Sequence, residues 1–73
     1  MFIQVQEIPM GPFGGPTWIN SEKVLYIDGF WGNEGGKPNS NIENYHIHLE
    51  GSNRTIKLDK QEGLRVLKIL GIL

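Results

Sequence analysis

Cysteine is absent from this sequence of 73 residues. Without thiols, neither a disulfide nor a thiolate-bound metal can supplement the hydrophobic core. The absence also fits a reducing compartment, and we expect a cytoplasmic protein. A chain of this size forms a single domain, here residues 1–73 with no separate linker, and buries only about 60% of its unfolded surface. Self-association is the remaining common way to bury more.

The sequence also lacks a long apolar run and an excess of charge of one sign. No apolar stretch approaches the ~20 residues of a membrane span. Residues 1–7 alternate like a strand and do not have the composition of a signal peptide. Seven basic and eight acidic residues give a formal net charge of −1. We therefore expect no membrane partner, and nucleic acid is a poor candidate on electrostatic grounds.

Catalytic, cofactor and metal-binding motifs are missing as well. No serine has a recognisable nucleophile context, and Gly35-Gly36-Lys37 lacks the spacing of a P-loop or a dinucleotide fingerprint. His46 and His48 share one strand face with Glu50 and could ligate zinc. A lysine expected beside His48 opposes a dication, which favours a solvated polar face, or pH sensitivity within an interface. The sequence predicts no enzyme, no metal and no cofactor.

The clearest pattern that is present lies in the last third of the chain. Residues 43–50 and 54–58 alternate apolar with polar side chains, and the turn-forming run 51–54 lies between them. This pattern predicts a β-hairpin. Folding it about Ser52-Asn53 places apolar opposite apolar throughout. The predicted pairs are Glu50 with Thr55, Leu49 with Ile56, His48 with Lys57, and Ile47 with Leu58.

A capped helix is predicted directly after the hairpin. Asp59 stands at the N-cap with Glu62 three residues on, which is close to a capping box. The helix should run over residues 60–70, and Gly71 should end it. Its apolar side chains cover an arc of about 220°, whereas a helix on one sheet needs a stripe of ~100° or somewhat more. They are Leu64, Val66, Leu67, Ile69 and Leu70.

This apolar surplus has two explanations. Either a strongly curved sheet wraps the helix, or a symmetric dimer or larger oligomer buries the second flank. We expect the oligomer, because a core of this size is small. The expected interface residues are Val66, Ile69, Leu70 and Leu73.

The first half of the chain contains strand patterns and two loops. Strands are expected at 2–8 and at 17–19 together with 24–31, and Trp18 is expected in the core. Mobile loops are expected at 9–16 and 32–44, the second being unusually long for a compact domain. The predicted fold class is therefore α+β: a small curved antiparallel sheet of three to five strands with one C-terminal amphipathic helix packed on it.

The order Trp18-Ile19-Asn20, then Val24 and Ile27, then the hairpin and the amphipathic segment, looks like many very short bacterial and phage β-sheet proteins. The same strand–hairpin rhythm is similar to that of the small flagellar and swarming motility proteins of the FlbD type. The resemblance covers about half the chain. The loops at 9–16 and 32–44 have no counterpart in it, and no function or site residue carries over.

The favoured function is that of a non-enzymatic interaction protein. It would be homo-oligomeric through the helix and would act as a regulator or inhibitor by binding a protein partner. Aromatic residues are common anchors in such interfaces. The expected partner-binding residues are Phe13, Phe30 and Trp31.

Two alternatives remain open. An oligomeric protein could sequester a small polar ligand, for example a nucleotide, between its subunits. Its expected polar contacts are Lys37, Asn39, Asn41 and Arg54. A single-stranded nucleic-acid binder could stack bases on sheet aromatics, although only Lys23 and Lys37 lie near them in sequence.

Overall fold

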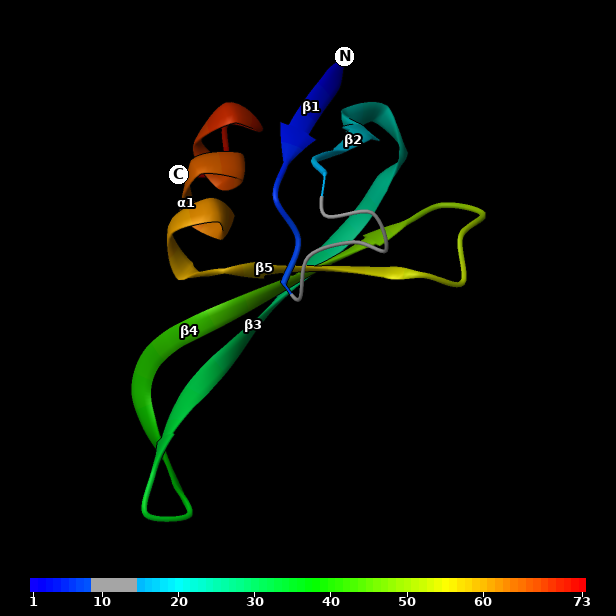
Figure 1. Ribbon diagram of the computed structural model, residues 1–73. Helices are drawn as coiled ribbons and strands as arrows, with labels where there is room; N and C mark the ends of the chain where they lie inside the picture. The colour runs from blue at the N-terminus through cyan, green and yellow to red at the C-terminus, as the bar shows by residue number, and fades with distance from the viewer. Residues whose placement is uncertain (9–14) are drawn as a thin grey trace.

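The structure, a computed structural model, describes residues 1–8 and 15–73. It confirms the α+β prediction, with two antiparallel sheets and one C-terminal helix packed on them (Figure 1). The elements are β1 (Phe2–Val5), β2 (Thr17–Asn20), the short 3-10 helix η1 (Ser21–Lys23), β3 (Val24–Glu34), β4 (Lys37–Leu49), β5 (Thr55–Asp59) and α1 (Lys60–Ile69). β1 pairs with β2, and the second sheet has the order β3-β4-β5.

Several predicted bounds need correction. β1 ends at Val5, short of the expected residue 8, and β2 pairs with β1 in a sheet separate from β3. Most of the predicted loop 9–16, including Phe13, lies outside the described residues. Its expected mobility and the partner role of Phe13 stay predictions.

The core lies between the two sheets and the helix. It is built from alternate positions of each strand, because successive side chains of a strand point to opposite faces. Its buried members are Ile3, Val5, Ile19, Ile47, Ile56, Leu58 and Val66. Tyr45 is also buried, and Gly63 of α1 lies against its ring: a Cβ at Gly63 would come within 2.1 Å of Tyr45 Cδ2. A glycine at this position lets the helix approach the sheet.

The two predicted helix ends are confirmed. The Asp59 carboxylate accepts a hydrogen bond of 2.9 Å from the backbone N–H of Glu62. The Glu62 side chain, however, does not return to Asp59, as a full capping box requires, and accepts a hydrogen bond from the Gln6 N–H just after β1 instead. Gly71 has φ +78°, and Ile72 N–H donates to Leu67 C=O at 2.9 Å, which closes the last turn.

The predicted register of the β4–β5 hairpin is wrong by two residues. Ile47 lies opposite Ile56, and Lys57 lies opposite His46 and not His48. A shift of two keeps every apolar side chain on the same face, so the buried face of the hairpin was predicted correctly although the pairs were not. The predicted register is wrong because the turn is larger than the symmetric turn that the prediction assumed. In this turn Gly51 has φ +75°, and Ser52 Oγ accepts a hydrogen bond from the Arg54 N–H at 3.1 Å.

Residues 32–44 are not a loop. β3 continues to Glu34 and β4 begins at Lys37. Gly35 and Gly36 join them with φ +58° and +84°, values typical of the tight two-residue turn that matches the twist of a hairpin. The outer part of this hairpin extends well beyond the rest of the molecule (Figure 1). We call residues 29–42 the arm.

Candidate interaction surfaces

Most of the described aromatic side chains of this protein are exposed. Of seven aromatic residues, six fall within residues 1–8 and 15–73, and only Tyr45 of these six is buried. The other five are between 42% and 67% exposed: Phe2, Trp18, Tyr26, Phe30 and Trp31. The expectation that Trp18 lies in the core is wrong. Ile19 is the inward-facing residue of β2, and its neighbour Trp18 therefore faces outward.

Two of the predicted partner-binding residues lie in the inner part of the arm. Phe30 is 42% exposed and Trp31 is 59% exposed. As neighbours on a strand they face opposite sides of the sheet. The Phe30 ring lies 4.1 Å from the ring of His46. Trp31 pairs with Ile42 on the same face as the buried side chains but beyond the last of them, which leaves its ring accessible.

The outer face of the three-stranded sheet carries a second group of rings. Tyr26 stacks on His48, with centroids 4.1 Å apart and planes inclined by 12°. The His48 ring is held from another side by Asp28, whose Oδ2 lies 2.9 Å from Nε2. Tyr26 and Asp28 stand on alternate positions of β3, and this spacing places both beside one histidine.

His46 lies on the same face in a more basic setting. Burial lowers the pKa of His46 below its ordinary value, and the neighbouring Lys57 and His48 lower it further, against the opposing effect of Asp28. The lysine that was expected to oppose metal binding beside His48 lies beside His46 instead. Within residues 1–8 and 15–73, no group of three or more metal-ligating side chains is placed to hold an ion.

An apolar groove lies between the start of β3 and the end of α1. Its volume is about 370 Å³, and its walls include Leu25 and Ile27 from β3 and Leu67, Leu70 and Ile72 from the C-terminal segment. Leu25 and Ile72 are 62% and 61% exposed. The groove is therefore an open apolar surface and not part of the core.

The residues predicted for an oligomer interface divide into two groups. Ile69 and Leu73 are 43% and 65% exposed, and Leu70 is half-buried in the groove. Val66 is 0% exposed because it belongs to the core. The inclusion of Val66 in an interface was wrong: the sheets cover more of the helix than the arc alone indicated. The other three positions stay available to a partner.

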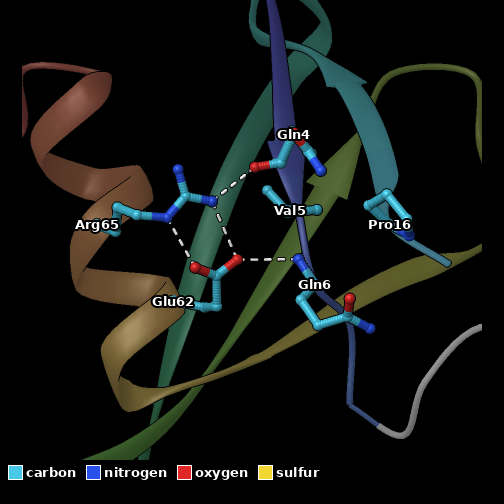
Figure 2. A pocket seen from close by; sticks show the side chains of 6 residues that line it. All are labelled: Gln4, Val5, Gln6, Pro16, Glu62 and Arg65. Carbon is cyan, nitrogen blue, oxygen red and sulfur yellow. Dashed lines mark hydrogen bonds and ion pairs between the residues drawn. The ribbon is translucent and has the colours of Figure 1, made fainter. Parts of the chain in front are cut away.

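A polar pocket of about 320 Å³ lies on the opposite flank of the helix (Figure 2). Arg65 donates to the Gln4 C=O at 2.6 Å, and the Glu62 carboxylate accepts from the Gln6 N–H at 2.9 Å. Arg65 and Glu62 also bond to each other at 2.7 Å. The two helix side chains thus hydrogen-bond the outer edge of β1 as a neighbouring strand would. Sequence reasoning missed this pair, which shows only as an ordinary i, i+3 spacing.

Electrostatics favours the charged state of this pair. The hydrogen bond from Arg65 lowers the pKa of Glu62, the Gln6 amide lowers it further, and partial burial acts in the opposite direction. The same bond raises the pKa of Arg65. Both side chains therefore stay ionised at neutral pH, and the arrangement is that of a clamp between helix and sheet.

The four predicted ligand contacts do not form one group. Lys37, Asn39 and Asn41 occupy alternate positions at the outer end of the arm, and Asn39 Oδ1 accepts from the Asn41 N–H at 2.9 Å. Arg54 follows the opposite end of β4 and forms an ion pair with the buried Glu7. A shared site within one chain is therefore not present. A site between subunits stays a prediction.

The chain matches no protein-family model, no curated protein and no solved structure. No comparison supports the resemblance to short motility proteins of the FlbD type. Among the described residues, no helix has the length and apolar character needed to cross a membrane.

Proposed function

We propose that this chain is a small non-enzymatic interaction protein that self-associates and binds a protein partner, as a regulator or an inhibitor. The observation that supports the proposal is the exposure of five of the six described aromatic side chains. Tryptophan, tyrosine and phenylalanine are enriched in protein interfaces and supply most of their hot spots. Apolar side chains that gather on an open surface favour association over an isolated monomer.

Partner binding is assigned to the inner part of the arm. Phe30 and Trp31 project from opposite faces of β3, and both rings are accessible without any change in the core. The arm lies away from the helix and the β1–β2 sheet (Figure 1), which leaves room for a partner on either side. Phe13 joins them as the anchor predicted from sequence.

Self-association is assigned to the apolar groove and the adjoining helix end. Ile69, Leu70 and Leu73 were predicted for this role, and Ile72 lies with Leu70 in the groove wall. Two copies carry only one net negative charge each, and charge repulsion between them is small.

Affinity capture with matched tryptophan variants tests the partner-binding proposal. The wild-type chain and Trp31→Ala are immobilised, and bound proteins from the source cells are quantified by mass spectrometry. Trp18→Ala is the control, since Trp18 and Trp31 are 58% and 59% exposed. We expect one specific partner that Trp31→Ala loses and Trp18→Ala retains. Equal capture by all three immobilised chains contradicts the proposal, provided that their circular dichroism spectra agree.

The outer sheet face supports one alternative, the binding of nucleobases. Tyr26, Phe30 and the two histidines present flat rings there, with Lys57 beside them. Base stacking on such rings contributes about 1–3 kcal/mol per base. A labelled single-stranded oligonucleotide titrated at low salt, together with melting curves in the presence of nucleotides, tests it. Binding that Tyr26→Ala abolishes supports this alternative, and no change in anisotropy or melting temperature excludes it.

A further inference from the structure

The strand edges of this protein differ in how they are protected. An edge strand presents unpaired N–H and C=O groups that can pair with another chain, and proteins usually block such edges. The outer edge of β1 and the residue after its end are covered by Arg65 and Glu62, which bond to the main chain at Gln4 and Gln6. At the outer edge of β5, the Lys57 C=O accepts a hydrogen bond of 2.9 Å from the Ile8 N–H.

The free edge of β4 is blocked in another way. β5 pairs with β4 only from Asn44 to His48, so residues 37–43 have an open side. The register against β3 shows extra β4 residues here: Glu43 lies between two successive pairs, and residues 39–41 oppose Gly32 alone. Bulges of this kind bend and twist an edge and discourage pairing. Pro38 adds a position without an amide donor.

The outer edge of β3 is less protected. Its one extra residue against β4 is Leu25, and the two register shifts on either side of Trp31 come from extra residues of β4. Within residues 1–8 and 15–73, no hydrogen bond from another segment reaches this edge. The stretch contains neither lysine nor proline. A long edge with exposed apolar side chains is a template for strand addition.

We propose that a second copy of this chain pairs with β3 edge to edge, antiparallel, about a two-fold axis at Gly29. The proposal rests on the self-association proposed above and specifies where it occurs. Gly29 is the midpoint of β3, so this register pairs the whole strand with its equivalent. The two three-stranded sheets become one continuous sheet, and both exposed β3 edges disappear.

The register places each arm beside the apolar groove of the other copy. About Gly29, Trp31 falls opposite Ile27 of the second copy, and the two side chains share a face because directly paired residues point the same way. Ile27 is in the wall of the groove with Leu25 and Ile72. The groove is thus incomplete in one chain, and Trp31 of the second copy covers it, while Phe30 on the outer face stays open to a protein partner.

Charge and area are both compatible with this pairing. Asp28 falls opposite Phe30, and Glu34 falls opposite Val24, so no like charges face each other. Aromatic side chains carry roughly 150–250 Å² each, and Tyr26 and Trp31 are both more than half exposed. Leu25 and Ile72 are also more than half exposed, so the pairing covers apolar side chains together with the main chain of the strand.

The first test is the molar mass by light scattering over a concentration series, for the wild type, Trp31→Lys and Trp18→Lys. The two tryptophans are equally exposed, but only Trp31 lies in the proposed interface. We expect a wild-type dimer, an unchanged dimer for Trp18→Lys, and a dissociation constant at least about tenfold higher for Trp31→Lys, because a charge replaces a central aromatic anchor. A dimer that Trp31→Lys leaves intact overturns the proposed edge.

A second test identifies the axis directly. The chain has no cysteine, so Gly29→Cys introduces a single thiol at the position where the two copies meet. Paired residues of adjacent antiparallel strands have Cα atoms about 4.5–5.5 Å apart, within the range of a disulfide. Mild oxidation should cross-link Gly29→Cys quickly and Asn53→Cys, in the exposed β4–β5 turn, only slowly. Equal rates overturn the register.

The outcomes separate the two proposals. An oligomer that Ile69→Lys or Leu73→Lys dissociates, and that Trp31→Lys does not, supports self-association at the helix end and rejects the β3 edge. A monomer at all concentrations rejects the self-association proposal and the edge proposal together.

Discussion

β1 and β3 are both edge strands of this small protein, but their edges are treated in opposite ways. The β1 edge is short, lies beside α1 and is hydrogen-bonded by Glu62 and Arg65 (Figure 2). The β3 edge is long, leaves the body of the molecule and receives no such bond from the described residues. The β1 edge is thus satisfied within the chain, whereas we propose that the β3 edge pairs with another chain. On this proposal, stability and association are carried by different parts of the molecule.

The largest expected effect is a difference in stability between a substitution in the core and one in the arm. Leu58 is 0% exposed at the centre of the core, and Leu58→Ala should lower the free energy of unfolding by about 2–5 kcal/mol through lost burial and a residual cavity. Trp31→Ala, measured in dilute solution, should change it by no more than about 0.5 kcal/mol. Urea unfolding followed by circular dichroism measures both. Equal losses would mean that the arm is part of the folding core.

Gly63→Ala tests how closely the helix packs on the sheet. Alanine in a helix interior is normally favoured over glycine by about 1 kcal/mol. Here the added Cβ would lie 2.1 Å from the buried Tyr45 ring, and overpacking should instead destabilise the protein by about 1–3 kcal/mol. In a Tyr45→Ala background the clash is gone, and the same substitution should be neutral or stabilising. A gain in the wild-type background would contradict the close helix–sheet contact.

Asp59→Ala tests the junction between β5 and α1. The substitution removes the carboxylate that accepts from the Glu62 N–H, and we expect a loss of about 1 kcal/mol. Asp59→Asn keeps an N-cap acceptor and should restore most of it. Lys60→Ala, at an exposed neighbouring position, is the control and should be nearly neutral. An unchanged melting curve for Asp59→Ala would contradict the cap.

Glu62→Gln should have the smallest effect, below about 1 kcal/mol, because the ion pair is partly solvated. The pKa of Glu62 in the folded protein lies below its ordinary value of 4.5. Its contribution to stability is therefore present above pH 4.5 and is lost as the pH falls through the lower, folded-state pKa. Wild-type stability should decline more steeply with acidification than that of Glu62→Gln. Parallel pH profiles from urea unfolding would contradict the proposed clamp.

The C-terminal third was the most predictable part of the chain, for local reasons. Alternation and a cap depend on residues close in sequence, and Asp59, Gly71 and the apolar face of the hairpin were all predicted. The register failed because Gly51 and Ser52 form a larger turn, and parity cannot distinguish registers that differ by two. The prediction that Val66 lies in an interface was wrong because its burial depends on which strands cover the helix. The sequence pattern of the helix alone does not reveal those strands.

The arm was the least predictable part. Residues 32–44 are polar and rich in glycine and asparagine, which disfavour strands. They form strands because β3 and β4 pair with each other across the Gly35-Gly36 turn. Likewise, no local pattern brings Arg65 to Gln4 or Arg54 to Glu7. These contacts, and the open edge of β3, appear only when the strands are placed in space.

Amide hydrogen exchange measured residue by residue in dilute and concentrated solution tests the central claim most directly. Ile47 lies on β4 between β3 and β5, and its amide should exchange slowly at every concentration. The amides of residues 26–34 that point away from β4 should exchange rapidly in dilute protein and slowly in concentrated protein, because the second copy covers them. Rapid exchange of these amides at all concentrations would contradict the claim that β3 pairs with another chain.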